Sequence, residues 1–384
     1  MKTLSLIMGI TVLTLAACSH KSNEQTVANN ENSKTEMKTE TYKISITGLD
    51  NVESGQESGV SGAFIGVADG KIIQAGGCNF PVEPMAPDSK KKFYEGIYVV
   101  EFTNDTTWQP KRIGTLPQAM AYGAAVSLPE GIVLIGGNDG SKSYPDVRLL
   151  KLTDNGSELI EMATLPVAAD NIAATAIDST IYVAGGSVDG QPSNRVFCLD
   201  LKTSEKWEEL PSMPGNPRVQ PVVAHGKDSL GNEHLYVWGG FAGKGKDRDA
   251  SLNTDGLKYD FATKTWTTLP APTDSEGTEV STGGGFATIL PDGKIAVEGG
   301  VNKDIFLAAL QNQAPDYLQH PIGWYKFNPN LLIFDPSTEQ WTVALTSEEL
   351  ARAGAGMVAA NGGLYVSGGE LKPRIRTAEI VFVK

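Results

Sequence analysis

The chain has 384 residues, with 32 Lys and Arg against 45 Asp and Glu, so its formal charge at neutral pH is −13. This balance argues against a nucleic-acid-binding protein, whose binding domain is usually basic. Hydrophobic residues make up 40% of the chain, charged residues only 20%, and glycine contributes 42 residues. Such a composition excludes a disordered chain and predicts a turn-rich globular protein with a sizeable core.

Residues 1–17 have the features of a secretory signal peptide. Lys2 precedes a mostly apolar run, 4–17, that is too short to span a bilayer as a helix. The run ends in Leu-Ala-Ala-Cys18, which resembles the lipobox of bacterial lipoproteins, where the cysteine is lipidated and becomes the new N-terminus. The alternative is an ordinary cleavage site followed by an incidental cysteine.

Residues 18–41 are polar and are predicted to be a flexible tether, so that the folded domain spans 42–384. We therefore expect an exported bacterial lipoprotein that is periplasmic or anchored in the outer membrane. The lipid on Cys18 is the only membrane contact expected.

A strand-like segment that ends in Gly-Gly recurs six times in the predicted domain. These segments are 72–77, 132–137, 181–186, 235–240, 295–300 and 364–369. A stretch of small apolar residues precedes each segment, and a loop and an alternating strand follow. Four repeats then place a tryptophan in a fourth strand, namely Trp108, Trp207, Trp266 and Trp341. Four short strands per repeat, with no amphipathic helix between them, predict the blade of a propeller.

The glycine pair with tryptophan downstream resembles the kelch repeat, so the expected fold is all-β, a six-bladed kelch-type β-propeller. The chain ends in a strand at 377–383 that is third in the sixth blade. Residues 42–47 alternate in polarity and are available as its fourth strand. The two ends of the chain are therefore expected to share one blade and close the ring.

The topology of an antiparallel blade sorts the loops between two rims. The end of each second strand and the start of the next blade's first strand lie on one rim, because strand direction alternates. The segments that follow the glycine pairs and those that precede the first strands should therefore surround one mouth of the channel, where a ligand is expected. Polar residues predicted to contact a ligand at this mouth are Tyr122, Asn138, Asp139 and Asn302.

Basic side chains also gather at the predicted mouth, although the chain is acidic. They are Arg218, Arg352, Lys372, Arg374 and Arg376. A basic mouth on an acidic protein predicts a small anionic ligand, because an arginine binds a carboxylate through two parallel hydrogen bonds. The alternative for each arginine alone is a solvated or ion-paired surface residue.

Glu370 directly follows the last glycine pair and lies among these basic residues. A carboxylate flanked by guanidinium groups stays ionised at neutral pH and can act as a general base toward a bound hydroxyl. Glu370 is equally well placed as an ion-pair partner of Arg376 that holds the loop. In that case Glu279 and Asp139 are the next acidic candidates on the rim.

Metal and cofactor motifs are not found in the sequence. The four histidines are not spaced as a metal pair, and Cys78 and Cys198, the two cysteines beyond Cys18, are predicted to be free thiols. There is no Gly-x-Ser-x-Gly elbow, P-loop or dinucleotide fingerprint. We therefore expect neither a metal nor a cofactor.

Five segments resemble the N-acetylneuraminate epimerase, or sialic acid mutarotase, family of kelch propellers. They are Pro217–Gln220, Leu235–Gly240, Gly299–Phe306, Phe334–Trp341 and Gly368–Thr377. They follow the order of the family from the third blade onward, whereas the first two blades resemble the last two blades of the family. The chain is therefore similar to a cyclically permuted member, and a closed ring tolerates such a permutation.

The resemblance implies an isomerase that interconverts the α and β anomers of N-acetylneuraminic acid by acid–base ring opening and reclosure. It also implies that a pocket Glu and Arg carry the chemistry, which here are Glu370 and Arg376. Weaker candidates to hold the sugar carboxylate are Arg218, Arg352 and Lys372.

Some family members have Arg where this chain has Met120, which indicates a departure in the substrate contacts. The competing hypothesis is a non-catalytic propeller lipoprotein that binds a sialylated glycan or a protein partner. The sequence leaves open whether the protein is a monomer or a homodimer, and which sugar it prefers.

Overall fold

The structure, a computed structural model, describes residues 37–43, 59–100, 110–203 and 205–384. Residues Met37–Lys384 form one compact unit. The predicted signal peptide, Cys18 and Trp108 lie outside the described residues. No helix within those described ranges is long and apolar enough to cross a membrane.

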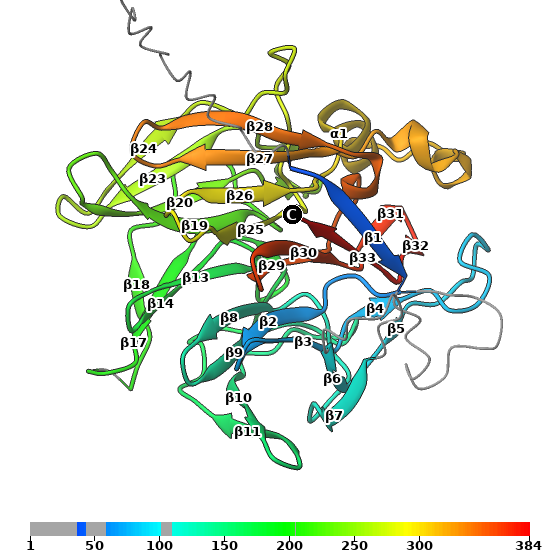
Figure 1. Ribbon diagram of the computed structural model, residues 1–384. Coiled ribbons are helices and arrows are strands. Elements are labelled where there is room, and N and C mark those ends of the chain that lie inside the picture. The colour runs from blue at the N-terminus through cyan, green and yellow to red at the C-terminus, as the bar shows by residue number, and fades with distance from the viewer. Residues whose placement is uncertain (1–36, 44–58, 101–109, 204) are drawn as a thin grey trace, which may run out of the picture. The chain divides into compact units, whose positions relative to one another are not determined.

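The described chain is all-β, as predicted, and contains six four-stranded antiparallel sheets (Figure 1). The first contains β2 (Phe64–Ala68), β3 (Lys71–Ala75), β6 (Gly96–Val100) and β7 (Lys111–Thr115). The second contains β8 (Ala124–Leu128), β9 (Gly131–Ile135), β10 (Val147–Thr153) and β11 (Gly156–Glu161). The third contains β13 (Ala173–Ile177), β14 (Thr180–Ala184), β17 (Val196–Asp200) and β18 (Glu208–Leu210).

The remaining three sheets follow in chain order and share the same strand pattern. The fourth contains β19 (Val222–Lys227), β20 (Glu233–Trp238), β23 (Gly256–Asp260) and β24 (Thr265–Leu269). The fifth contains β25 (Phe286–Ile289), β26 (Ile295–Glu298), β27 (Asn330–Asp335) and β28 (Gln340–Thr346). The sixth contains β29 (Gly356–Ala360), β30 (Gly363–Ser367), β33 (Glu379–Val383) and β1 (Thr39–Lys43).

Each predicted glycine-paired segment thus contains the second strand of a sheet, followed by two glycines that the local backbone requires. Gly76 and Gly77 have φ angles of +64° and +97°, a region that favours glycine. A Cβ atom on Gly76 would also lie 2.4 Å from the backbone oxygen of Met120. Any other residue at Gly76 would therefore push the first sheet away from the segment that enters the second.

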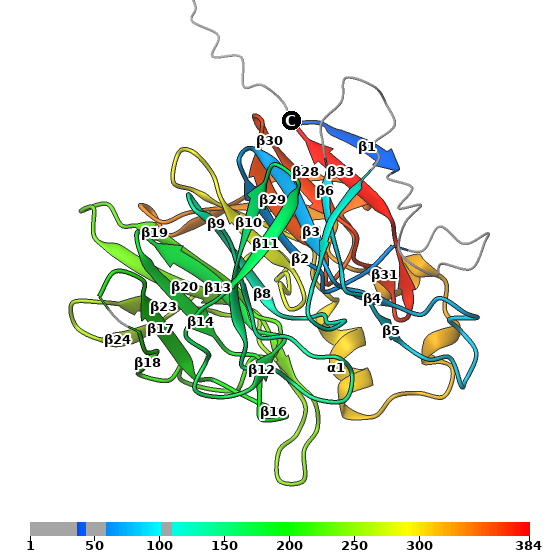
Figure 2. The same ribbon diagram turned by 90° about the horizontal axis from the view of Figure 1, so that it is seen from below.

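Short hairpins follow the glycine pairs. They pair β4 (Cys78–Asn79) with β5 (Lys92–Phe93), β15 (Ser187–Val188) with β16 (Gln191–Pro192) and β12 (Ala169–Asp170), β21 (Phe241–Ala242) with β22 (Ser251–Leu252), and β31 (Glu370–Lys372) with β32 (Ile375–Arg376). Figure 2 shows β4, β5, β12, β16 and α1 (Lys303–Gln311) toward one side of the sheets, in agreement with the predicted common rim.

The first strands of successive sheets contact one another, from β2 through β8, β13, β19 and β25 to β29, and β29 contacts β2 (Figure 1). The residues that precede these strands are joined by backbone hydrogen bonds. The amide of Tyr122 donates to Gly62, Asn171 to Tyr122, Gln220 to Asn171, Gly284 to Gln220, Gly354 to Gly284 and Gly62 to Gly354, at 2.6–3.0 Å. We call these six residues the inner circuit.

Apolar side chains fill the spaces between neighbouring sheets. Between the fourth and fifth sheets, Trp238 packs against Phe334 and Trp341, with ring centroids 4.8 Å and 5.1 Å apart. Small residues of the first strands, among them Ala124, Ala174 and Ala287, line a cavity. The large apolar side chains of the core clusters lie between neighbouring sheets.

Two details differ from the sequence-based predictions. Strand β1 covers Thr39–Lys43 instead of 42–47, and it pairs with β33 so that Thr39 faces Val383; residues 44–58 lie outside the described ranges. The long loop after the fifth glycine pair contains α1 and the 3₁₀ turns η1 (Tyr317–Gln319) and η2 (Ile322–Tyr325); a third turn, η3 (Glu348–Leu350), precedes β29. Asn302 starts α1 by accepting hydrogen bonds from the amides of Asp304 and Ile305.

Candidate functional site

Glu370 and Arg376 face each other across the hairpin of β31 and β32. The Arg376 guanidinium lies 2.9 Å from Glu370 Oε2, and the other carboxylate oxygen accepts a hydrogen bond from the Arg374 amide at 2.9 Å. The Arg376 side chain is 3% exposed, whereas that of Glu370 is 23% exposed. The pair therefore has a buried cation and a carboxylate that a ligand can approach.

Tyr122 connects this pair to the centre of the protein. Its hydroxyl lies 3.3 Å from Ser61 Oγ and accepts a hydrogen bond from Lys91 Nζ at 3.5 Å. Burial raises the pKa of the Tyr122 phenol well above its usual value, Cys78 and Glu370 raise it further, and Arg376 opposes them. The phenol is consequently a neutral hydrogen-bond donor at physiological pH.

The electrostatic environment of Arg376 favours its charge. Burial by itself lowers the pKa of the guanidinium, but the nearby Glu370 carboxylate, Tyr122 and Cys78 raise the pKa overall. The Phe80 ring lies 5.6 Å from the guanidinium carbon and adds a cation–π contact. Arg376 therefore supplies a fixed positive charge directly behind the carboxylate.

Lys91 is a site residue that the sequence analysis missed. Its ammonium group lies 5.0 Å from the ring centroid of Tyr122 and 5.8 Å from that of Phe80. The signal was present, because Lys90–Lys92 is a basic run in a loop that follows the first glycine pair and so belongs to the predicted rim. The loop is long, and its reach toward Tyr122 depends on its path through space.

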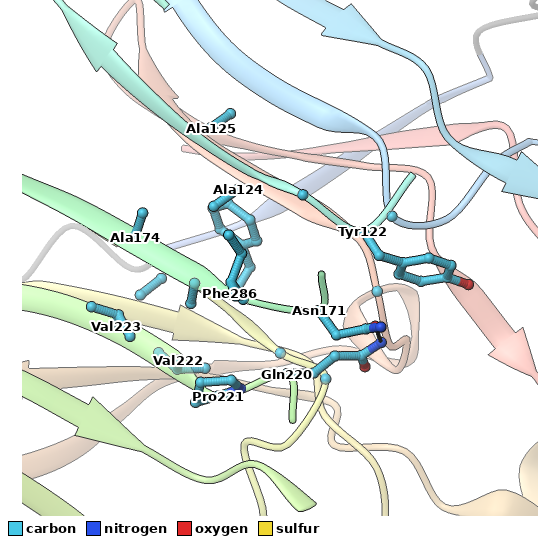
Figure 3. Close-up of a pocket in the computed structure, with 18 of the residues that line it drawn as sticks. Tyr122, Ala124, Ala125, Asn171, Ala174, Gln220, Pro221, Val222, Val223 and Phe286 are labelled. Carbon is cyan, nitrogen blue, oxygen red and sulfur yellow. Dashed lines mark hydrogen bonds between the residues drawn. The ribbon is translucent and has the colours of Figure 1, made fainter. Parts of the chain in front are cut away.

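An open cavity of about 760 Å³ lies against Lys91 and Tyr122. Its other lining residues are Phe93, Asn138, Asp139, Gly140, Ser141, Asn171, Val219, Gln220 and Phe241. A narrower apolar cavity continues inward past Ala124, Ala174, Val223 and Phe286, and Figure 3 shows Tyr122, Asn171 and Gln220 together at one end of it. The larger cavity is suited in size to a small polar ligand.

Arg218 and Arg352, predicted as substrate contacts, take structural roles instead. Both side chains are buried, and each donates a hydrogen bond of 2.8 Å to the first glycine of a pair, Gly239 for Arg218 and Gly368 for Arg352. Arg218 also contacts the Asp255 carboxylate at 2.8 Å. Both guanidinium groups therefore bind backbone oxygens within their own sheets.

Met120 occupies the same structural position as these two arginines. Its backbone oxygen accepts from the Gly77 amide, as that of Arg218 accepts from Gly186 and that of Arg352 from Gly300. Its side chain is 3% exposed within an apolar cluster. In this chain the position that Arg218 and Arg352 hold in two other sheets is therefore taken by a buried apolar side chain.

The side chains of Lys372 and Asn302, which were also predicted to contact a ligand, bind backbone groups of the protein instead. Lys372 Nζ donates to the backbone oxygens of Leu318 and His320 at 3.3 Å and 2.7 Å. The Asn302 side chain caps α1. Together with the buried arginines, Lys372 shows that much of the predicted basic cluster fastens backbone segments.

Asn138 and Asp139 do line the cavity, as predicted, but the loop uses their side chains. The Asp139 carboxylate accepts hydrogen bonds from Ser141 and Tyr144 hydroxyls, both at 2.6 Å, and from the Lys142 amide. These bonds hold the pKa of Asp139 far below its usual value. Asn138 Oδ1 accepts from the Gly140 amide at 3.1 Å.

Within the described residues, no group of three His, Cys, Asp or Glu side chains is arranged to hold a metal ion. Cys78 and Cys198 are free thiols, as predicted. Cys78 lies beside the Glu370–Arg376 pair, and its thiol lies 3.7 Å from the backbone oxygen of Ser61.

Glu279 was the other acidic candidate on the rim. Its carboxylate forms an ion pair with the surface residue Lys303 at 3.1 Å.

The N-acetylneuraminate epimerase family model matches residues 24–160 and 162–384. The chain belongs to this family. N-acetylneuraminate epimerases of Haemophilus influenzae (strain PittEE) and Escherichia coli (strain K12) are each 32% identical to it, over 232 and 219 residues. The matches cover 56% and 53% of this chain and 57% and 55% of those relatives, so the chain spans little more than half the length of the relatives it matches.

A solved structure, titled "Structure of YjhT", has a similar fold. It superposes with a TM-score of 0.58 and 14% sequence identity, covering 87% of this chain and all of that one. At this identity the similarity concerns the fold alone.

Proposed function

We propose that this protein is a mutarotase-type epimerase that interconverts the α and β anomers of N-acetylneuraminic acid without a cofactor. The observation that carries the proposal is the Glu370–Arg376 pair beside Tyr122 in a member of this family. The carboxylate is partly exposed and held by a buried cation, which is the arrangement expected for a base that must accept a proton and return it.

Glu370 takes the proton of the anomeric hydroxyl. The bond between the anomeric carbon and the ring oxygen then breaks, its electron pair passes to the ring oxygen, and Glu370 gives that oxygen the proton it has taken. The product is the open keto form. After rotation about the bond next to the carbonyl, the hydroxyl formed from the ring oxygen attacks the other face of the carbonyl. Glu370 takes the proton of this hydroxyl and gives it to the new anomeric oxygen, so the carboxylate is regenerated.

Arg376 and Tyr122 assist these steps by electrostatic stabilisation. The fixed charge of Arg376 keeps Glu370 oriented and stabilises the negative charge that develops on oxygen. The neutral Tyr122 phenol donates a hydrogen bond to the ring oxygen as the bond breaks. Lys91, beside Tyr122 on the open cavity, supplies the positive charge that attracts the sugar carboxylate.

We propose that the six sheets are the blades of a six-bladed kelch propeller, closed where β1 joins β33. The six hydrogen bonds of the inner circuit and the contact of β29 with β2 support this arrangement. We further propose that the chain is cyclically permuted relative to its family. A collinear match that stops at 232 residues, although the family model matches nearly the whole chain, supports the permutation.

We propose that the protein is exported and anchored through a lipid on Cys18. The apolar run that ends in Leu-Ala-Ala-Cys18 supports this proposal. Cys18→Ala, expressed in a bacterial host that processes lipoproteins, should move the protein from the membrane fraction to the soluble fraction. A variant that still sediments with membranes would rule out this anchor.

The activity is tested by NMR of freshly released α-N-acetylneuraminic acid. A sialidase generates the α anomer in the tube, and the decay of its signal is followed with and without the purified protein. The protein should accelerate the decay. Binding without acceleration would instead favour the non-catalytic propeller that binds a sialylated ligand.

A further inference from the structure

The inner circuit is chemically asymmetric. Three of its positions are glycines, namely Gly62, Gly284 and Gly354. The other three positions, which follow one another around the circuit, are Tyr122, Asn171 and Gln220. The φ angles of these last three are +61°, +51° and +49°. Side-chain-bearing residues rarely adopt this left-handed region, and Asn is tolerated there better than Tyr or Gln. Since glycine forms the same backbone hydrogen bonds in half of the circuit, the fold itself does not require these side chains.

The side chains of Asn171 and Gln220 are held in a fixed orientation at the cavity. Gln220 Nε2 donates to Asn171 Oδ1 at 2.6 Å, and Asn171 Nδ2 donates to the Asp170 carboxylate. Asp170 is buried and also accepts a hydrogen bond from Ser143. Figure 3 shows the two carboxamides against each other, with Tyr122 next to them.

The two carboxamides have donors and an acceptor that the protein does not use. A primary amide has two N–H donors and a carbonyl oxygen, and the bonds above use one donor of each residue and the oxygen of Asn171. Among the residues that the structure describes, Gln220 Oε1 has no hydrogen-bond partner, and a Cβ on Gly284 would lie 3.2 Å from it. The unused acceptor therefore faces the glycine half of the circuit, and both residues line the cavity of about 760 Å³.

We propose that the carboxamides of Asn171 and Gln220 bind the neutral hydrogen-bonding substituents of the ligand, its hydroxyl or acetamido groups. The charged side of the site, formed by Lys91 and the Glu370–Arg376 pair, then receives the carboxylate and the anomeric centre. Backbone strain is retained at binding sites when the strained side chain contributes to binding, which accounts for Tyr122, Asn171 and Gln220 in place of glycine. The identity of the sugar in this inference rests on the proposed function.

The test replaces Asn171 and Gln220, one at a time, by the glycine that the other half of the circuit uses. Asn171→Gly and Gln220→Gly keep the backbone geometry and remove the carboxamide. The KM for N-acetylneuraminic acid should rise about 3- to 10-fold for each variant, the effect of one or two lost hydrogen bonds, while kcat changes less. The melting temperature should stay the same or rise, because the strain is relieved.

Asn361→Gly is the matched control. Asn361 has a φ of +48° in the turn between β29 and β30, so the substitution relieves the same strain outside the proposed site. This variant should keep the wild-type KM. A rise in KM for Asn361→Gly equal to that for Asn171→Gly would overturn the inference, because the effect would then follow from backbone relaxation.

A second ligand, in which a hydroxyl replaces the acetamido group, identifies the substituent. Weaker binding of N-acetylneuraminic acid alone assigns the carboxamides to the acetamido group, and weaker binding of both sugars assigns them to hydroxyls. Unchanged KM for both sugars in both variants overturns the inference while leaving the activity intact. If the wild type binds without catalysis, the same variants are compared by Kd from saturation-transfer NMR; a wild type that binds neither sugar overturns both proposals.

Discussion

Two glutamates of this protein interact with arginines in regions of opposite character. Glu370, in the hairpin of β31 and β32, is 2.9 Å from Arg376, and its side chain is 23% exposed. Glu298, at the end of β26, is 1% exposed, and its Oε2 has no hydrogen-bond partner among the described residues. Burial raises the pKa of Glu298 to about 8, against the opposing charge of Arg352. Glu370 can therefore exchange a proton with a ligand, whereas Glu298 is a neutral part of the core at neutral pH.

The two arginines differ in the same way. Arg352 donates to the backbone oxygens of Glu349, Gly368 and Glu379, and burial lowers its pKa. Arg376 is directed at the Glu370 carboxylate. The comparison predicts that only the Glu370–Arg376 pair takes part in the proposed chemistry, because its carboxylate is partly exposed and its arginine contacts that carboxylate, whereas Arg352 binds backbone oxygens.

The largest effect on stability is expected for Arg352→Met. The substitution leaves the backbone oxygens of Glu349, Gly368 and Glu379 without their donor, so the free energy of unfolding should fall by about 3–5 kcal/mol. Urea denaturation measures this change. Arg195→Met is the control, since the Arg195–Glu209 ion pair is partly exposed, at 33% and 43%, and should cost less than about 1 kcal/mol. Equal losses would contradict the structural role of Arg352.

Arg376→Lys tests the role of the second pair, Glu370 with Arg376. Lysine keeps the charge but loses the planar guanidinium that orients Glu370, so kcat/KM should fall by about 10- to 100-fold, through both kcat and KM. Steady-state anomerisation kinetics measure the change, and circular dichroism checks the fold. Wild-type kinetics for this variant would show that the pair only closes the hairpin.

Glu298→Gln is expected to change the pH dependence of stability and little else. The folded-state pKa of Glu298 is raised to about 8, from about 4.3 in the unfolded chain, so its stabilisation is complete below the unfolded pKa and is lost as the pH rises through 8. Glutamine cannot ionise. The fall in melting temperature between pH 5 and pH 8 should therefore shrink by roughly 2–5 °C in the variant. Parallel melting profiles would contradict the buried neutral state.

The strands could be predicted from the sequence because the backbone requires glycine at fixed places after each second strand. The two glycines after each second strand are required by positive φ and by close contact, as at Gly76, so their spacing located six sheets correctly. The Glu370–Arg376 contact was also predictable, since the two residues are cross-strand partners in a short hairpin.

Other parts of the site depend on side-chain direction and loop path, which the sequence does not encode locally. Arg218 and Arg352 lie in the predicted segments, but their side chains turn to the glycine carbonyls of their own sheets. Lys91 reaches Tyr122 from the end of the long loop between β4 and β5. The left-handed backbone of Tyr122 and Gln220 has no signal in residue preference, because neither residue type favours it.

The most direct test of the central claim compares Glu370→Gln and Glu298→Gln in the same anomerisation assay. Both variants neutralise a carboxylate with nearly the same shape. We predict that Glu370→Gln lowers the rate by about 10²- to 10⁴-fold, the usual effect of losing a general base, while its melting temperature stays close to that of the wild type. Glu298→Gln should retain the wild-type rate. A Glu370→Gln variant that turns over N-acetylneuraminic acid at the wild-type rate would contradict the account.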